Sequence, residues 1–373
     1  MLNNEIVYQI FVRNYSEEGT FQKVKDDLPR IKDLGADIIY LMPIHPIGVL
    51  NRKGTYGSPY SISNYFEITN DYGTLEDFKS LINSIHELGM KIIIDMVFNH
   101  TSYDNVLVGT HPEYYFYKNG KLGNRVGEWS DIADLDTRRY ETREYLLSVL
   151  KYWVRQGVDG FRFDVASMIP LEFFKKAREE LGPDIIFIGE SIDPGFASYL
   201  RSIGDEPTYD KDMFPTFDSL YNYSWFMSFI AYIKGETSTT DKLINDFNND
   251  NKELKNNGVR LNCLENHDNE RIANLVKLDK LEQLLDFFSH LKGQLFIYAG
   301  QEYGIKHKPE LFEKDPINWK KDDQIYALYK KAIETKKKQP QIDYQLIDKI
   351  SEKKILLISY KDEKIIDQRE FEI

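Results

Sequence analysis

The sequence predicts an α/β fold in which short parallel strands alternate with helices. Seven apolar runs rich in β-branched and aromatic residues are separated by stretches whose apolar residues recur at helical spacing. This alternation is typical of consecutive βα units in a parallel sheet. The strand candidates are Ile6–Phe11, Ile38–Leu41, Ile92–Val97, Gly160–Val165, Ile185–Gly189, Val259–Leu264 and Leu295–Ala299.

Amphipathic stretches between these runs predict the helices. Thr74-Leu-Glu-Asp77 has the pattern of a capping box, in which side chains satisfy free backbone N–H groups at a helix start. Leu75, Phe78 and Ile82 then fall on one face of the helix. Similar stripes follow other runs, and we expect the last helix over Gln324–Lys338.

Closing a barrel needs an eighth strand, and the sixth strand in chain order has the weakest pattern. We expect it near Met213–Phe217, where the apolar pattern gives way to sequence rich in Tyr and Asn. With this strand included, the polar motifs described below favour a closed (β/α)8 TIM barrel over an open sheet.

Two segments fall outside the βα pattern. Residues 100–141 run through Gly, Asn, Asp and clustered aromatic residues, far beyond the roughly 2–6 residues usual for a βα loop. After the last helix, Lys354–Tyr360 and Glu363–Ile366 predict a strand, a turn and a strand. We therefore expect a barrel over residues 1–99 and 142–338, a short excursion over 100–141 that walls a cleft, and a small C-terminal β appendage over 339–373.

Composition limits the partners and the location. Asp and Glu total 60 against 48 Lys and Arg, so the net charge of -12 disfavours binding to nucleic acid or anionic lipid. The single cysteine, Cys263, cannot form an internal disulfide or a zinc cluster. The N-terminus lacks a signal-peptide pattern, and no stretch approaches the ~20 apolar residues of a membrane span. We expect a cytoplasmic protein without nucleic-acid or membrane partners.

Polar residues gather at the carboxyl ends of four strand candidates. In a barrel, these strand ends form one rim, so the side chains are expected to meet at a single site. The clusters are Asp95–His100, Arg162–Asp164, Glu190 and Asn266–Asp268.

Arg162 and Asp164 lie two positions apart in one strand, so their side chains point the same way. A guanidinium group beside Asp164 favours its ionised form, which a nucleophilic carboxylate requires. Considered alone, this pair could equally be a structural ion pair that ties the barrel together.

Glu190 directly follows the apolar run Ile185–Gly189. Desolvation and neighbouring carboxylates would raise its pKa, which suits a general acid. Adjacent strands lie about 4.7–4.9 Å apart, and retaining glycosidases hold their two carboxyl groups about 5–5.5 Å apart. Asp164 and Glu190 on adjacent strands therefore favour a retaining mechanism over an inverting one.

The remaining polar residues leave alternatives open. Asp268 is accompanied by His267 and Arg271 and is placed to grip sugar hydroxyls. His100 and His267, each taken alone, could be buried core histidines or metal ligands. Barrels host many reactions, so chemistry through a metal or a Schiff base also stays open on these residues alone.

These motifs together resemble the α-amylase superfamily of glycoside hydrolases, over nearly the whole chain. The ordered set is what carries the resemblance, since a single short motif is a weak signal. The matching segments are Gly57-Ser-Pro-Tyr60, Asp95-Met-Val-Phe-Asn-His100, Ile132-Ala-Asp-Leu-Asp136, Gly160-Phe-Arg-Phe-Asp164, Gly189-Glu190 and Asn266-His-Asp268.

The resemblance implies a role for each candidate residue. Asp164 would be the nucleophile, Glu190 the acid and base, and Asp268 the stabiliser of the transition state. The residues implied to contact the sugar are Tyr60, His100, Arg162, His267 and Arg271, with Tyr60 as an aromatic platform under the ring at the cleaved bond.

The chain departs from the family at two positions after the nucleophile. Polysaccharide-cleaving members often carry a Lys-His pair there, whereas this chain has Ser167 and Met168. This departure puts two properties in doubt, the binding of sugars beyond the cleaved bond and the binding of calcium. Asn99 and Asp134 match two remaining calcium-ligand positions, but calcium takes about 6–8 oxygen ligands. No cofactor is required for the chemistry, and a structural calcium stays open.

The resemblance also suggests a substrate. The segment Ala133-Asp-Leu-Asp136 is more similar to α-1,4-cleaving amylases than to α-1,6-glucosidases or cyclodextrin-degrading relatives. This similarity implies starch-derived glucans or maltooligosaccharides. The short excursion implies a shallow cleft and short substrates, unless the natural chain is truncated. The alternatives are an α-glucan transglycosylase or isomerase of the trehalose-synthase kind, and a catalytically inactive amylase-like binding protein.

Overall fold

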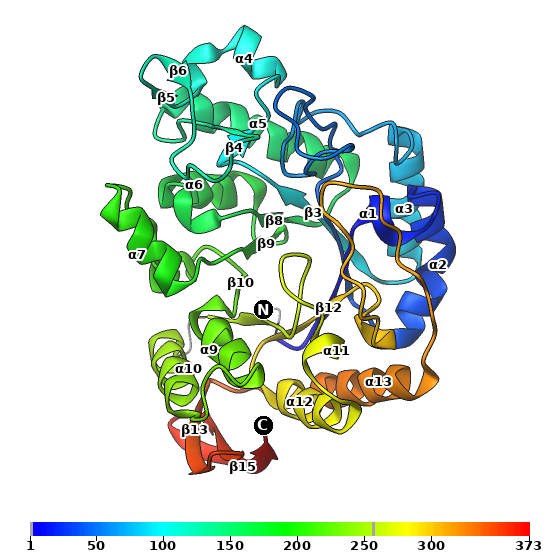
Figure 1. The fold of residues 1–373 in the computed structure, drawn as a ribbon, viewed down its shortest axis with the longest axis vertical. Coiled ribbons are helices and arrows are strands. Elements are labelled where there is room, and N and C mark those ends of the chain that lie inside the picture. Colours follow the sequence, from blue (N-terminus) through cyan, green and yellow to red (C-terminus); the bar gives the residue numbers. More distant parts are fainter. Residues whose placement is uncertain (1–2, 256–257) are drawn as a thin grey trace.

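A closed eight-stranded parallel barrel forms the body of the computed structural model, which describes residues 3–255 and 258–373. The strand order is β1-β12-β11-β10-β9-β8-β3-β2, so neighbours along the chain are neighbours in the barrel and the first strand pairs with the last (Figure 1). This confirms the predicted (β/α)8 barrel. The strands are β1 (Ile6–Ile10), β2 (Ile38–Leu41), β3 (Lys91–Met96), β8 (Gly160–Phe163), β9 (Ile186–Gly189), β10 (Ser219–Tyr221), β11 (Arg260–Cys263) and β12 (Gln294–Tyr298).

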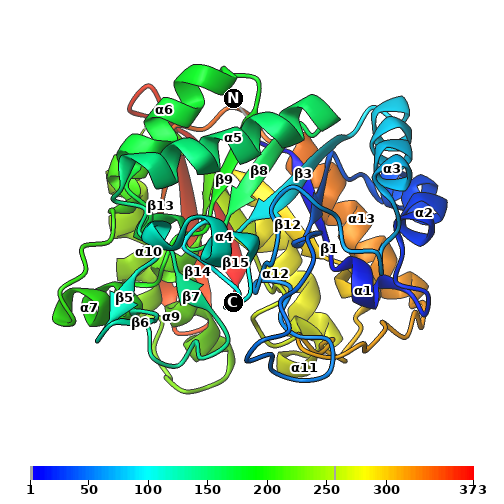
Figure 2. The ribbon, with the colours of Figure 1, turned by 90° about the horizontal axis from the view of Figure 1, so that it is seen from above.

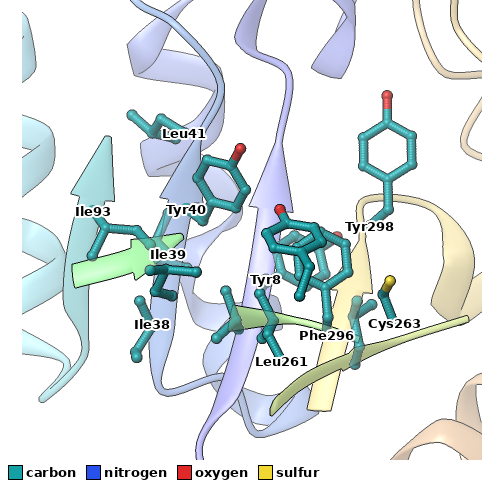
Figure 3. Packing of buried hydrophobic residues seen from close by; sticks show 14 of the residues in the cluster. Tyr8, Ile38, Ile39, Tyr40, Leu41, Ile93, Leu261, Cys263, Phe296 and Tyr298 are labelled. Atoms are coloured by element: carbon teal, nitrogen blue, oxygen red, sulfur yellow. The ribbon is translucent and has the colours of Figure 1, made fainter. Parts of the chain in front are cut away.

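Both faces of the barrel sheet are covered, so its strands are apolar without alternation. Every residue of β1, β2 and β12 is buried, as expected for parallel strands with helices on one side and the barrel interior on the other. Tyr40 and Phe296 approach within 6.3 Å of each other, measured between ring centroids (Figure 3). Tyr8 of the strand between them bonds instead to Glu302 and Arg30, outside the barrel.

The helices follow the strands around the outside (Figures 1 and 2). The predicted capping box is confirmed, because Asp77 N–H donates to Thr74 Oγ1 at 3.1 Å and Thr74 N–H donates to Asp77 Oδ2 at 2.8 Å. The helices of the barrel are α1 (Val12–Tyr15), α2 (Phe21–Leu34), α3 (Leu75–Glu87), α5 (Tyr140–Gln156), α6 (Leu171–Leu181), α7 (Pro194–Ser202), α8 (Asp210–Met213), α9 (Tyr223–Ile233), α10 (Asp241–Leu254), α11 (Ile272–Leu275), α12 (Leu278–His290) and α13 (Asp323–Lys337), with 3-10 turns at Ala166–Met168 and Gln301–Tyr303.

The sixth strand lies two residues beyond the predicted position. It is β10, Ser219–Tyr221, whereas Met213 ends helix α8 and Phe217 packs its ring 4.7 Å from that of Phe174. The apolar residues at the predicted position are therefore buried in side-chain packing against helix α6 and not in the strand ladder. The strand itself is only three residues long and begins with a serine, so its apolar signal is small.

The excursion after the third strand is confirmed, and it folds back onto the barrel rim. Its short strands β4 and β7 pair antiparallel, with His100 opposite Asp134. In both views β5 and β6 lie on the same side of the molecule as helix α7 (Figures 1 and 2). The elements are β4 (His100–Thr101), α4 (Val106–Thr110), a 3-10 turn at Pro112–Tyr114, β5 (Tyr117–Lys118), β6 (Lys121–Leu122) and β7 (Ala133–Asp134).

The C-terminal β piece is also confirmed, with one more strand than predicted. Its antiparallel strands are β13 (Tyr344–Ser351), β14 (Lys354–Lys361) and β15 (Lys364–Glu372). The first of them docks on helix α10, where Asn248 bonds the backbone of Ile347 through both amide atoms. Its outer half is exposed and polar, which hides the strand pattern. The boundaries at residues 99, 142 and 338 stay predictions.

Within the described ranges, no helix combines the length and the apolar character that crossing a bilayer requires.

Candidate active site

A cavity of about 350 Å³ opens at the rim formed by the carboxyl ends of the strands. All three predicted carboxylates line it, so the structure brings together what the sequence placed in separate motifs. The cavity is lined by Lys53, Ser58, Tyr60, His100, Trp129, Asp131, Ile132, Asp164, Val165, Glu190, His267, Asp268, Leu311 and Phe312.

A buried arginine connects the acidic groups beneath this cavity. The Nη1 atom of Arg162 donates to Asp95 Oδ1 at 2.8 Å and to Asp164 Oδ1 at 2.9 Å. Its Nη2 atom lies 3.0 Å from Glu190 Oε2. The arginine is only 1 % exposed, so it interacts with these carboxylates in a medium of low dielectric, where the attraction is strong. One guanidinium group thus holds Asp164 and Glu190 beside each other.

Strand pairing sets the positions of the two candidate catalytic carboxylates. Strands β8 and β9 are adjacent, Phe163 pairs with Gly189, and Asp164 and Glu190 are the next residue on each strand. The chain then turns sharply at Val165, whose φ of 37° is in the left-handed region. A β-branched residue avoids this region, at a cost of about 1–3 kcal/mol. The strained turn directs the Val165 N–H to Glu190 Oε2, at 2.7 Å.

Burial controls the protonation of the pair. It raises the pKa of Glu190 to about 7, with the Asp268 and Asp95 charges adding to the rise and Arg162 opposing it. Burial also raises the pKa of Asp164, more than the Arg162 guanidinium lowers it. The expectation that Arg162 alone keeps Asp164 ionised is therefore incomplete, because desolvation outweighs the ion pair. Two close carboxyl groups of this kind share one proton over a range of pH.

A hydrogen-bonded chain on the other wall involves His267. Its Nε2 atom lies 2.7 Å from Tyr60 Oη and 3.1 Å from Asp268 Oδ2. Its Nδ1 atom lies 3.0 Å from Gln9 Nε2. A carboxylate accepts and an amide nitrogen donates, so the neutral ring that fits all three partners carries its proton on Nε2 and accepts at Nδ1. Burial lowers the pKa of His267 and favours this neutral form.

Tyr60 connects His267 to the arginine cluster. Its ring stacks on that of His267, with centroids 5.3 Å apart and planes 14° apart, and its hydroxyl donates to Asp95 Oδ2 at 3.0 Å. Tyr40 donates to the same Asp95 oxygen at 2.6 Å. Asp95 therefore orients Tyr60 and Arg162 together, at the floor of the cavity.

His100 completes the wall on the side of the excursion. Its ring centroid lies 5.7 Å from that of Trp129, and burial lowers its pKa to about 4. It therefore faces the cavity as a neutral imidazole, which can donate one hydrogen bond to a sugar hydroxyl.

Arg271 does not belong to this cavity, which corrects the expectation that it contacts the sugar. Its side chain is fully buried, and it donates to Glu265 Oε1 at 2.7 Å and to the backbone carbonyl of Ala299 at 2.9 Å. The physical reason is Glu265, a buried carboxylate that needs a cation and takes the guanidinium inward.

The structure adds residues that the sequence motifs did not indicate. Gln9 and Tyr40 are polar groups inside apolar strands, and such an interruption is the available signal for a residue facing the barrel interior. Lys53 and Asp131 form an ion pair of 2.9 Å at the cavity mouth. Trp129, one of the clustered aromatic residues of the excursion, also lines the cavity.

Comparison with known proteins assigns the family. Residues 9–126 and 113–327 match the family model described as the alpha amylase catalytic domain. The chain belongs to the α-amylase family. The match covers most of the chain and identifies this enzyme as a glycoside hydrolase of that family.

Similar proteins share most of the fold of this amylase-family enzyme. A crystal structure of an alpha-amylase from Lactobacillus plantarum is 38 % identical, with a TM-score of 0.90 over 96 % of this chain and 86 % of that one. Alpha-amylase 3 of Dictyoglomus thermophilum is 26 % identical over 97 % of this chain and 84 % of its own. An intracellular maltogenic amylase of Bacillus subtilis is 29 % identical over 82 % of this chain, which spans about half of it (52 %).

Substitutions at Gln9 test the tautomer of His267. Gln9→Glu replaces a neutral amide by a carboxylate against Nδ1, so it favours the imidazolium ion and the pKa of His267 rises. Gln9→Met removes the donor without adding charge, so Nδ1 loses its partner and the free energy of unfolding falls by about 1 kcal/mol. Imidazole ¹⁵N chemical shifts over a pH titration measure the pKa and the state of Nδ1, and urea denaturation measures the free energy of unfolding. An unchanged Nδ1 signal in Gln9→Met contradicts the assigned network.

Proposed function

We propose that the enzyme hydrolyses α-1,4-glucosidic bonds of starch-derived glucans or maltooligosaccharides and retains the configuration of the released sugar. The observation that carries the proposal is the pair Asp164 and Glu190, placed at the ends of adjacent strands and held by one buried guanidinium group. The names of the similar proteins, which include alpha-amylases and a maltogenic amylase, support this class of substrate. The relative named as intracellular supports a cytoplasmic location.

The mechanism has two displacements at the anomeric carbon. Asp164 attacks that carbon as Glu190 gives its proton to the glycosidic oxygen, so the bond to the leaving sugar breaks and a glycosyl-aspartate ester forms. Glu190, now ionised, takes a proton from water. The resulting hydroxide attacks the anomeric carbon from the other face and breaks its ester bond to Asp164. The released sugar has its original anomeric configuration.

The spacing of the carboxyl groups supports retention. Neighbouring strands lie about 4.7–4.9 Å apart, close to the ~5–5.5 Å between the carboxyl groups of retaining glycosidases. Inverting enzymes need a gap of about 6.5–9.5 Å to admit a water molecule. Asp164 and Glu190 contact Nη1 and Nη2 of the same guanidinium at 2.9 and 3.0 Å, so one group holds both carboxylates close together, which supports the narrower spacing.

The other cavity residues bind and orient the sugar. Asp268 is half exposed in the cavity and is free to accept hydrogen bonds from ring hydroxyls. His100, a neutral imidazole, supplies a donor for the same ring, whereas the single N–H of His267 is directed at Tyr60 and Asp268 and orients them. Tyr60 offers an aromatic face as a platform, while Arg162 acts through the carboxylates that it holds.

The covalent intermediate permits a second reaction. If a sugar hydroxyl replaces water in the second displacement, the enzyme elongates or isomerises the glucan. Chromatography of maltotriose products over time separates the two reactions, because hydrolysis gives only shorter sugars and transfer also gives longer ones.

The roles of the two carboxylates are tested by removing each group. Asp164→Asn is expected to lower kcat by about 10⁴-fold or more, because the nucleophile is lost. In the Glu190→Gln variant, Asp164 still attacks α-maltosyl fluoride, because the fluoride leaving group needs no proton. The variant cannot activate water for the second displacement, so the glycosyl ester accumulates. Mass spectrometry after acid quenching is expected to find the maltosyl adduct on the peptide that contains Asp164. An adduct on any other residue would refute the assignment.

The pH profile follows from the same pair. Glu190 must be protonated in the first step, so kcat/KM falls as pH rises through its pKa, near 7. Asp164 must be ionised, and burial raises its pKa, so the acidic limb lies above the range of an ordinary aspartate. Asp268→Asn removes one charge that raises the pKa of Glu190, so the basic limb of the residual activity moves to lower pH. A limb that moves to higher pH contradicts the assignment.

The predicted calcium position contains an arginine. Asp134 Oδ2 accepts from the Arg125 backbone N–H at 2.8 Å and from its guanidinium at 3.2 Å. That guanidinium also lies 3.8 Å from Asp205. Asp134 Oδ1 has no hydrogen-bond partner among the described residues, but a cation there would meet the guanidinium charge. In residues 3–255 and 258–373, no group of three or more His, Cys, Asp or Glu side chains gathers that could hold a metal ion. Because Arg125 also places a positive charge on Asp134, the pair Asn99 and Asp134 fits calcium poorly. We propose that Arg125 supplies the positive charge instead.

The effect of calcium on thermal stability tests whether Arg125 takes the place of a bound cation. EDTA and calcium chloride are both expected to leave the Tm of the wild type unchanged. Arg125→Met leaves the Asp134 carboxylate buried without its cation and lowers the free energy of unfolding by about 3–5 kcal/mol. Arg138→Met removes an exposed partner of Asp205 and costs about 1 kcal/mol or less. Stoichiometric calcium binding by the wild type, measured calorimetrically, would overturn the proposal.

A further inference from the structure

A second cavity, which we call the outer cavity, lies beside the connection from strand β2 to helix α3. Its volume is about 630 Å³, larger than the 350 Å³ of the catalytic cavity. Its lining comes from residues 46–75, which run from the end of β2 into α3, and from Tyr152 of helix α5. The two cavities share no lining residue, so the outer cavity is a separate site.

One loop, residues 47–57, contributes to the walls of both cavities. Arg52 and Tyr56 line the outer cavity, whereas Lys53 lines the catalytic one. Arg52 holds the loop together by donating to three of its backbone carbonyls, at 2.8, 3.2 and 3.3 Å. The Tyr56 N–H donates to the carbonyl of Phe312 at 3.0 Å, which ties the loop to another wall of the catalytic cavity. The shared wall is therefore pre-formed, and a ligand needs to order little of it on binding.

The polar groups of the outer cavity are mainly acceptors without a cation. Glu67 and Asp71 are both exposed and line the cavity. In residues 3–255 and 258–373, neither carboxylate takes part in a salt bridge. Arg52 is the cation of the lining, and three of its five N–H donors are used within its own loop. The carboxylates are therefore free to accept hydrogen bonds from a ligand.

Aromatic side chains supply the apolar part of the same lining. Tyr56 is 38 % exposed, and the ring of Tyr152 meets that of Phe66 edge-on with centroids 5.3 Å apart. Aromatic faces of this kind cover the apolar C–H faces of a pyranose ring, which water solvates poorly. The cavity thus offers apolar faces and hydrogen-bond acceptors together.

This combination selects a neutral ligand rich in hydroxyl groups. Two unpaired carboxylates repel phosphates and other anions, as does the net charge of -12. A lipid chain would leave the carboxylates without partners, at a cost in desolvation. A sugar chain satisfies both parts of the lining, because its hydroxyls donate to Glu67 and Asp71 while its rings lie against Tyr56.

We propose that the outer cavity is a second binding site for an α-glucan, distinct from the catalytic cavity. The site deepens the proposed function and rests on it, since that function makes a glucan the ligand at hand. A long glucan held there keeps its other segments near the catalytic cavity across the shared loop. The benefit is a higher effective concentration, so it applies to long chains and not to maltotriose, which is too short to use both sites.

Binding stoichiometry tests the second site directly. In the Asp164→Asn background no bond is cleaved, so calorimetry with maltoheptaose can count the sites. Two maltoheptaose molecules are expected per chain, and one in the same background with Tyr56→Ala/Asp71→Ala. A single molecule per chain before the double change, or two molecules after it, overturns the proposal.

Kinetics on long and short substrates test the consequence for catalysis. In Tyr56→Ala/Asp71→Ala, the KM for soluble starch is expected to rise about tenfold, equivalent to about 1.4 kcal/mol of binding. The kcat for starch and the KM for maltotriose keep their wild-type values, because the catalytic cavity is unchanged. Equal effects on the two substrates, including no effect on either, contradict the proposed coupling.

Matched variants separate ring stacking from the general loss of a side chain or a charge. Tyr56→Phe keeps the flat ring and is expected to bind two maltoheptaose molecules like the parent protein. Tyr140→Ala removes a tyrosine that is 58 % exposed and outside both cavities. Glu87→Ala removes an exposed carboxylate at the end of helix α3. Both controls leave starch kinetics unchanged, and a starch KM that rises equally in them refutes the site.

The trapped glycosyl ester distinguishes failure of the second site from failure of the proposed function. In Glu190→Gln treated with α-maltosyl fluoride, the ester fills the catalytic cavity. Maltoheptaose is still expected to bind this trapped enzyme, and to lose that binding when Tyr56→Ala/Asp71→Ala is added. An ester-bearing enzyme that does not bind maltoheptaose refutes the second site, whereas a wild type that neither forms the ester nor hydrolyses glucans refutes the proposed function.

Discussion

The buried guanidinium group of Arg162 is the interaction on which the site depends. It contacts Asp95, Asp164 and Glu190 from one position on strand β8. One positive charge cannot neutralise three carboxylates, so burial raises the pKa of the two that face the cavity. With all three carboxylates ionised the cluster would carry two uncompensated negative charges, and one proton on the pair removes one of them. A retaining glycosidase needs that state: one carboxylate ionised and its neighbour protonated.

Barrel closure makes this arrangement possible. A single arginine can reach both neighbours because β3, β8 and β9 are consecutive strands whose ends lie at one rim. Burying such charges costs several kcal/mol per ion, and the left-handed turn at Val165 adds strain. The apolar packing of the strands and surrounding helices stabilises the fold enough to tolerate these costs. The cavity is therefore the locally unfavourable part of an otherwise well-packed barrel.

Sequence patterns predicted the barrel and the carboxylates because both depend on local order. An apolar run predicts a strand, and a polar residue at its carboxyl end is predicted to lie at the barrel rim. Neither prediction requires knowing which residues that side chain contacts in the folded chain. Gln9 and Tyr40 could not be assigned in this way, since their partners His267 and Asp95 lie on other strands. The prediction for Arg271 was wrong for the opposite reason. Its proximity to His267 in the chain suggested a site residue, whereas Glu265 binds its guanidinium group in the core.

The segments beside the cavity were the hardest parts to predict. The excursion and helix α7 have little periodic pattern, and their contacts join segments far apart in the chain. Arg125 binds Asp134 within the excursion and also lies 3.8 Å from Asp205 of the barrel part, and Trp129 of the excursion contacts Phe196 of helix α7. An ion pair and an aromatic contact therefore fix one loop against the other. Because Asp164 and Glu190 directly follow strands β8 and β9, changes in these loops can reshape the cavity wall without moving either carboxylate.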